Sequence, residues 1–210
     1  MLADSFKKLT KTKAKKVLDD VNPYIDGSRF EPEGSTVMAQ DVTFYPEYSF
    51  LDLSDYNSHP PRKIFALYKA GSNDNDKHVQ ILNWTNVPIY EVNESAPIQL
   101  SESNILDYAR FFFSYVRGRH GRFLLTETVE DIQWREDPPP AARKAVAKMI
   151  EPMKIIGQDE DGAFHLRCCL MFKDSLFSAR VKITPTGEVD ISEEELVLED
   201  MPVFDDTLSQ

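Results

Sequence analysis

The chain has 210 residues, 41% of them hydrophobic and 11% aromatic, and a formal net charge of -11 at pH 7. This size and composition are typical of a globular protein with a sizeable core, and no apolar run approaches the ~20 residues of a membrane-spanning helix. The acidic balance disfavours a general nucleic-acid binder, because binding to phosphates depends on a net basic surface.

The N-terminal segment and the cysteines indicate a cytoplasmic protein. No apolar block follows the charged N-terminus, so we expect no secretory signal. Cys168 and Cys169 are adjacent, and neighbours on a strand point to opposite faces, so they provide no disulfide framework. Their spacing also differs from that of a two-cysteine metal site, whose ligands are usually about two to four residues apart.

Residues 1–22 are predicted to form a basic amphipathic helix, with helical spacing over 3–20 and a stop at Asn22 and Pro23. Six lysines lie among residues 1–16. The apolar stripe consists of Leu2, Phe6, Leu9, Val17 and Val21. The favoured interpretation is a helix that docks on the protein and exposes its lysines. The alternative is a contact with an anionic membrane surface or with the groove of a partner.

Residues 23–200 are predicted to form a single α+β domain, whose first half consists of short strands. Runs rich in β-branched and aromatic residues, separated by turn residues, predict strands at 37–44, 48–53, 63–69, 78–84 and 88–92. A polar loop at 71–76 alternates Asp and Asn. It lacks the later Gly and Glu of a calcium loop, so no metal site is predicted there.

A central helix is predicted at 103–117. Its apolar residues include Ile105, Ala109, Phe111, Phe112 and Tyr115. A helix that is apolar most of the way round is buried on several sides. A strand at 122–128 follows, and then a second helix at 138–150 whose prolines lie in its first turn.

Residues 164–192 are predicted to form a three-stranded antiparallel meander. Apolar residues alternate along each strand, with a two-residue turn at 174–175 and a three-residue turn at 185–187. These turns place Val181 opposite both Cys168 and Ile191, so that one face of the meander is continuously apolar.

These elements predict an α+β fold. Strands outnumber helices without regular alternation, which favours a curved, mainly antiparallel sheet packed on the 103–117 helix over a parallel doubly wound sheet. Residues 201–210 are predicted to form an acidic tail after the domain.

The strongest candidate site is the basic loop, residues 117–122, between the central helix and the next strand. Its cationic or titratable side chains are Arg117, Arg119, His120 and Arg122. Arginine forks match phosphate and carboxylate groups. The competing explanation is structural, since cations at the C-terminus of a helix are stabilised by its dipole and pair readily with the protein's own acids.

No motif in the sequence identifies a reaction. The chain contains no GxSxG elbow, SxxK, P-loop or GxGxxG, and its four histidines have no metal-binding spacing. We therefore expect no cofactor and no metal. The alternative function is a small enzyme for an anionic substrate, with His120 as general acid or base and the neighbouring arginines as anchors.

The leading hypothesis is a non-enzymatic binding or accessory protein. It would engage an acidic protein partner or a small anion through the basic loop. The six lysines of residues 1–16 and the nine acidic residues of 188–210 also predict self-association into a homo-oligomer.

Overall fold

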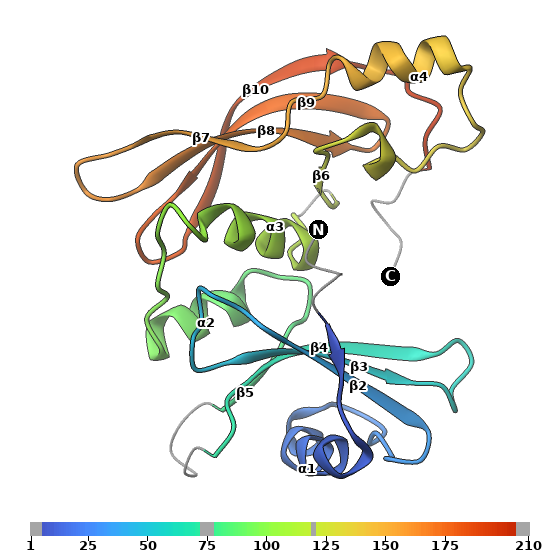
Figure 1. The fold of residues 1–210 in the computed structure, drawn as a ribbon, viewed down its shortest axis with the longest axis vertical. Coiled ribbons are helices and arrows are strands. Elements are labelled where there is room, and N and C mark those ends of the chain that lie inside the picture. Colours follow the sequence, from blue (N-terminus) through green and yellow to red (C-terminus); the bar gives the residue numbers. More distant parts are fainter. Residues whose placement is uncertain (1–5, 72–77, 119–120, 205–210) are drawn as a thin grey trace. The chain divides into compact units, whose positions relative to one another are not determined.

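The computed structural model describes residues 6–71, 78–118 and 121–204, and the chain divides into two compact units (Figure 1). The first unit consists of Met1–Asn83 and Val87–Gln99, the second of Trp84–Asn86 and Leu100–Gln210. The boundary falls within residues 23–200, the part predicted to be a single domain. In the described part of the chain, no helix has the length and apolar character that crossing a bilayer requires.

The first unit is an antiparallel sheet with a helix on one face (Figure 1). Its strands, in spatial order, are β1 Lys7–Lys8, β2 Ser35–Asp41, β3 Ser49–Asp55, β4 Arg62–Tyr68 and β5 Val79–Ile81. Helix α1, Lys11–Val21, packs Val17, Leu18 and Val21 into a core with sheet residues such as Leu51 and Leu53.

The predicted helix at 3–20 is therefore too long at its start. Lys7–Lys8 is a strand that pairs with Met38 and Ala39 of β2, and the helix begins only at Lys11. Residues 14, 17, 18 and 21 have the spacing of one helical face and are buried together. Phe6 instead lies beside Phe50 of β3, with ring centroids 5.6 Å apart, so tertiary packing replaces local helical spacing at this end.

The segment predicted as a strand at 88–92 is a helix. Helix α2 spans Val87–Ser95 and buries Pro88, Ile89 and Val92. The prediction followed the β-branched composition, but proline fits the first turn of a helix. Ile89 and Val92 are three residues apart, so on a helix they share the buried face.

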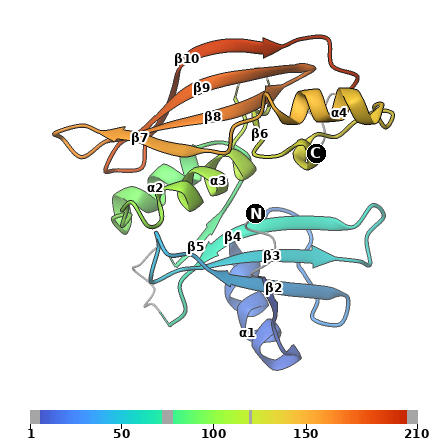
Figure 2. The ribbon, with the colours of Figure 1, turned by 45° about the horizontal axis from the view of Figure 1, so that its top comes forward.

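The described residues of the second unit form an antiparallel sheet, two α-helices and a short 3-10 helix at Val129–Asp131 (Figure 2). Its helices are α3 Ile105–Tyr115 and α4 Pro140–Ala147, and its strands are β6 Leu124–Leu125, β7 Lys154–Gln158, β8 Phe164–Phe172, β9 Ser175–Ile183 and β10 Val189–Leu198. The strand order is β10-β9-β8-β6, and β7 also pairs with β8. The predicted α+β class and the C-terminal antiparallel meander are confirmed, with the strands in two sheets.

One register within the meander differs from the predicted one by two residues. The turn from β8 to β9 is formed by residues 173 and 174, so Cys168 pairs with Ala179 and not with Val181. A shift of two residues leaves each side chain on its predicted face, so an alternating apolar pattern cannot distinguish the two registers. Lys173, in the turn, adopts a left-handed backbone conformation with φ 54°.

The second turn of the meander is as predicted. Val181 pairs with Ile191, and Gly187 has a φ of 80°, which glycine adopts without steric cost. Beyond this turn β10 is irregular, because its pairing with β9 shifts between Ser192 and Glu195. Glu193, at the shift, has a φ of 50°.

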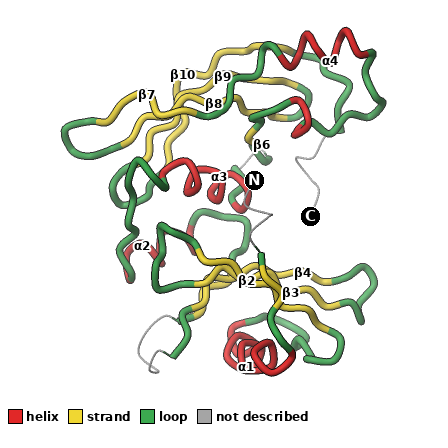
Figure 3. Tube along the Cα trace, viewed as in Figure 1, coloured by secondary structure: helices red, strands yellow, loops and turns green. Residues whose placement is uncertain are grey.

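Helix α3 lies beside the meander (Figure 3) and buries most of its residues. Its buried residues are Ile105, Tyr108, Ala109, Phe111, Phe112 and Phe113. The Tyr108 hydroxyl is fully buried and donates a hydrogen bond to the carbonyl of Gly187, in the turn between β9 and β10. A buried hydroxyl needs such a partner, so this bond fixes the rotation of the helix against the turn.

The start of the predicted tail at 201–210 is part of the second unit. Met201 and Val203 are buried in a core cluster, and Val203 forms a β-bridge with Trp134. Both are apolar residues among acidic neighbours, and they pack into the core although the composition of this end is acidic. Residues 205–210 lie outside the described ranges.

An ion pair joins α3 to the segment after β6. The Arg110 guanidinium donates to both carboxylate oxygens of Glu127, at 2.8 and 2.9 Å, and to Asp107 at 2.9 Å. The hydrogen bond to Glu127 is the largest effect that raises the pKa of Arg110. This two-pronged geometry is the strong form of the arginine–carboxylate contact.

Substitution of Glu127→Gln is expected to lower the free energy of unfolding by about 1–3 kcal/mol, because hydrogen bonds between charged groups are lost at a half-buried position. Urea unfolding followed by circular dichroism measures the loss. Glu130→Gln is the matched control: Glu130 is exposed, its contact with Arg143 is 3.4 Å long, and its loss should cost less than about 1 kcal/mol. Equal losses would mean that the Arg110 pair contributes no more than a surface contact.

Candidate functional site

The basic loop starts where α3 ends, and its first arginine is held by a tryptophan. The Arg117 N–H donates to the carbonyl of Trp84 at 2.8 Å. The Arg117 guanidinium also lies over the Trp84 ring, 4.3 Å from its centroid. Tryptophan is the best aromatic partner for a cation, so this side chain has a defined position within the second unit.

Two glycines close the loop. Gly118 and Gly121 form an antiparallel bridge, with N–H to carbonyl distances of 2.8 and 3.2 Å. Gly121 has a φ of 129°, a conformation that residues with a side chain rarely adopt. Arg119 and His120, the two candidate residues between these glycines, are not among the described residues.

The last arginine of the loop folds back onto α3. Arg122 Nη2 donates to the carbonyl of Ser114, in the last turn of the helix, at 3.2 Å. A cation at this end interacts favourably with the helix dipole. Of the four predicted residues, the structure thus places Arg117 and Arg122 at the end of α3, in contacts with their own chain.

A pocket lined by three phenylalanines lies against the same two glycines. This phenylalanine pocket has a volume of about 480 Å³. Its lining consists of Gly118, Gly121, Phe123, Phe172, Lys173, Phe177 and Glu194. The basic loop therefore borders a cavity within the size range of small-molecule sites.

The walls of the phenylalanine pocket are ordered by ring contacts. Phe123 and Phe172 stack with their centroids 4.9 Å apart, and the Lys173 ammonium lies 5.6 Å from the Phe172 centroid. The exposed Lys173 and Glu194 place one positive and one negative charge in the lining. The pocket is thus apolar inside, with charges among its exposed residues.

Sequence reasoning missed this pocket because its residues come from separate elements. Phe172 and Phe177 flank the turn between β8 and β9, and the alternating pattern assigned both to the core face. Both are only half-buried. The sequence feature that could have indicated the pocket is Phe123, an aromatic residue directly after the basic loop.

A second group of charges lies on the outer face of the meander. The Lys182 ammonium donates to Asp159 at 2.8 Å, and His165 Nε2 is 2.7 Å from the other oxygen of that carboxylate. The bond from Lys182, followed by that from His165, lowers the pKa of Asp159, and the same contact raises the pKa of Lys182. The three residues of the group are half-buried and belong to the surface of the sheet.

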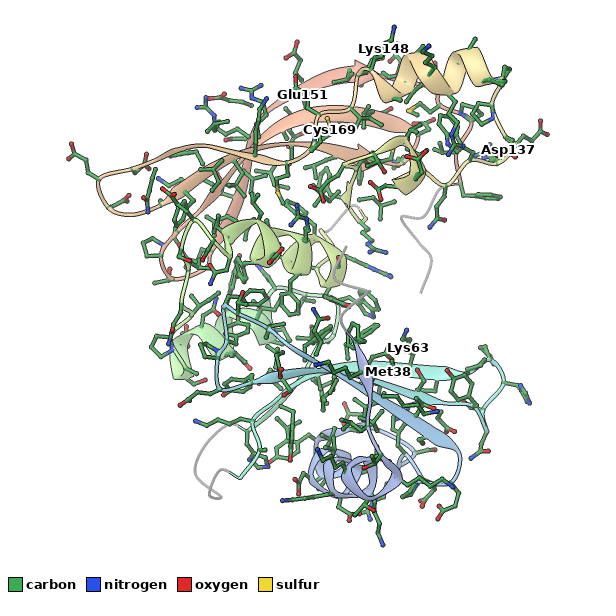
Figure 4. The ribbon with its side chains drawn as sticks, viewed as in Figure 1. Met38, Lys63, Asp137, Lys148, Glu151 and Cys169 are labelled. Carbon is green, nitrogen blue, oxygen red and sulfur yellow. The ribbon has the colours of Figure 1, made fainter. Side chains whose placement is uncertain are left out.

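The two cysteines are free and buried. Burial raises the pKa of the Cys168 thiol to about 12, so it remains protonated and a poor nucleophile at neutral pH. Figure 4 labels Cys169 and Glu151 in the second unit, where the Glu151 N–H donates to the Cys169 sulfur at 3.4 Å. In the ranges that the structure describes, no group of three or more His, Cys, Asp or Glu side chains is arranged to hold a metal ion.

Substitution of Lys182→Met is expected to raise the pKa of Asp159 towards its ordinary value, because the largest contact that stabilises the carboxylate is removed. Carbon-13 NMR of the Asp159 carboxyl group, titrated through acidic pH, measures the shift. In the wild type the contact stabilises the fold above the ordinary carboxyl pKa and loses this effect as pH falls through the lowered pKa. An unchanged midpoint in the variant would contradict the assignment.

Comparison of the chain with protein-family models, with curated proteins and with solved structures found no match. The chemistry of the site is therefore inferred from its own residues.

Proposed function

We propose that this protein is a non-enzymatic binding protein for an anionic ligand that also carries an apolar group. The ligand's apolar group occupies the phenylalanine pocket, and its acidic group faces Lys173 and the basic loop. The observation that carries this proposal is the shared position of Gly118 and Gly121, which belong to the basic loop and also line the pocket.

The apolar half of the ligand is argued from the walls of the pocket. Phe123, Phe172 and Phe177 are half-buried, so water contacts aromatic surface that a ligand would cover. Transfer of apolar surface out of water contributes roughly 25 cal/mol per Å². A flat ring or a branched aliphatic group fits walls that already stack against each other.

The anionic half is argued from the balance of charges. Lys173 and the arginines of the basic loop supply positive charge in a chain whose net charge is -11. Contacts with Trp84 and Ser114 set the positions of Arg117 and Arg122, and preorganised groups lose less entropy on binding. Glu194 opposes an anion, so the acidic group is expected to lie away from β10.

The alternative, an enzyme with His120 as general acid or base, rests on the sequence alone.

Two classes of ligand, a small carboxylate and an acidic peptide that contains a phenylalanine, share the chemistry proposed here. The first would be a metabolite-like ligand and the second an acidic protein partner, and the experiment below includes a probe for each.

Binding of 2-naphthoate, and separately of the acetylated peptide DEFDE, is measured by isothermal titration calorimetry on the full chain. The neutral analogue 2-naphthylmethanol is the chemical control, and we expect it to bind about tenfold more weakly than 2-naphthoate, because a charge-assisted hydrogen bond is lost. Tighter binding of the peptide than of 2-naphthoate would favour a protein partner over a small anion.

Two substitutions with opposite expected effects on affinity test whether 2-naphthoate binds at the phenylalanine pocket. Lys173→Asn removes the cation, while asparagine still tolerates the left-handed backbone at this position; it should weaken 2-naphthoate binding by up to about fivefold. Glu194→Gln removes the opposing charge and should strengthen binding by about twofold. The proposal fails if the neutral analogue binds as tightly as the anion, or if neither substitution changes the affinity.

A further inference from the structure

The second unit contains another pocket, whose charged lining residues are all acidic. This tryptophan pocket, of about 360 Å³, lies between the start of α4 and the segment after β10. Its lining consists of Trp134, Glu136, Asp137, Pro138, Pro139, Ala142, Val146, Leu198, Glu199, Asp200, Met201 and Pro202. Figure 4 labels Asp137 in the loop that precedes α4.

The inner lining of the tryptophan pocket is apolar and rigidly supported. Val146 and Met201 are buried members of a core cluster, and Trp134 and Leu198 pack against it. The segment before α4 and the segment after β10 are joined by a backbone hydrogen bond: the Arg135 N–H donates to the carbonyl of Pro202 at 2.9 Å. The tryptophan pocket is therefore built from residues that pack in the core of the second unit.

The exposed part of the lining is acidic. Glu136, Asp137, Glu199 and Asp200 are exposed, and among the described residues none of the four makes a side-chain hydrogen bond or ion pair. No described lining residue carries a positive charge. Four carboxylates around an apolar site attract a cation with an apolar stem, which is the chemistry of a lysine or arginine side chain.

The indole of Trp134 is an independent indication that the tryptophan pocket binds a ligand. Its Nε1–H is buried and makes no hydrogen bond in the described part of the chain, a state that costs free energy until an acceptor is supplied. A peptide has a carbonyl acceptor beside its cationic side chain, whereas a simple amine has none. Because this N–H is buried, the indole must turn before the N–H meets such a carbonyl. The Trp134 ring lines the pocket, and a ring face also favours a cation.

We propose that the tryptophan pocket binds an extended basic peptide segment of a partner protein. One lysine or arginine stem lies on Trp134 and Leu198, its cation faces the four carboxylates, and a backbone carbonyl accepts the indole N–H. The start of α4 offers little to a competing anion, because Pro138, Pro139 and Pro140 have no N–H to donate.

The test uses an acetylated, fluorescein-labelled peptide of sequence KPLKPLK, whose prolines favour an extended backbone. Fluorescence anisotropy measures its affinity for the full chain. The peptide EPLEPLE and the amine spermidine, as a competitor, are the chemical controls. We expect the basic peptide to bind, the acidic peptide not to bind, and spermidine to compete only weakly.

Two matched double variants distinguish binding at the tryptophan pocket from attraction to the overall negative charge of the chain. The variant Glu199→Gln/Asp200→Asn removes two pocket carboxylates, and asparagine suits the left-handed backbone of residue 200, where φ is 55°. The variant Glu188→Gln/Asp190→Asn removes two equally exposed carboxylates elsewhere in the same unit. We expect the first to weaken binding of KPLKPLK by about fivefold and the second to leave it nearly unchanged.

A second readout follows the indole directly. In a nitrogen-15 NMR spectrum, the peptide should shift the Trp134 indole N–H signal, which a Trp84→Phe variant distinguishes from that of Trp84. The inference is overturned if KPLKPLK does not bind, if both double variants weaken it equally, or if spermidine displaces it as well as unlabelled peptide does. An unshifted Trp134 signal under saturating peptide would also overturn it.

Discussion

Burial of α3 is the constraint on which the second unit depends. Six of its eleven residues are buried, so the helix has little freedom to rotate or slide without exposing aromatic surface. Three polar contacts then use this fixed position: Tyr108 holds the turn between β9 and β10, Arg110 holds Glu127, and the carbonyl of Ser114 receives Arg122. A mobile helix could not hold these three segments in place.

The basic loop inherits its geometry from this helix. Its first described arginine lies over Trp84 and its last returns to the final turn of α3, while the two glycines close the loop by backbone bonds. The structural and functional explanations of this cluster are therefore compatible. The contacts that Arg117 and Arg122 make within the chain also restrict their positions, and restricted cations bind an anion at a smaller cost in entropy.

The two pockets of the second unit differ in the charged residues that line them. The phenylalanine pocket has one cation, Lys173, and one acid, Glu194, in its lining, and the tryptophan pocket carries four carboxylates on a lining with no described cation. Net charge conceals this division, because it averages over the surface. Local charge next to apolar surface is what discriminates between partners, and two differently charged sites would keep two kinds of ligand apart.

Sequence patterns predicted the elements whose spacing is local. The meander and α3 follow from alternation and from helical periodicity, and both are present. The register between β8 and β9 did not follow, since two registers that differ by two residues bury the same faces. The α2 segment was mistaken for a strand because its composition outweighed the spacing of Ile89 and Val92. The pockets were not predictable, since their walls combine residues such as Phe123 and Phe177, or Trp134 and Leu198, that only the tertiary fold brings together.

The irregularity in β10 has a consequence for behaviour at high concentration. Among the described strands β10 pairs only with β9, so its other side presents backbone groups on which a strand from another molecule could assemble. The left-handed Glu193 breaks the regular row of these groups, and Glu194 and Glu195 add exposed negative charge at the same place. An incoming strand would meet a kinked and repulsive edge, so the β10 edge of the sheet is protected from pairing with another molecule.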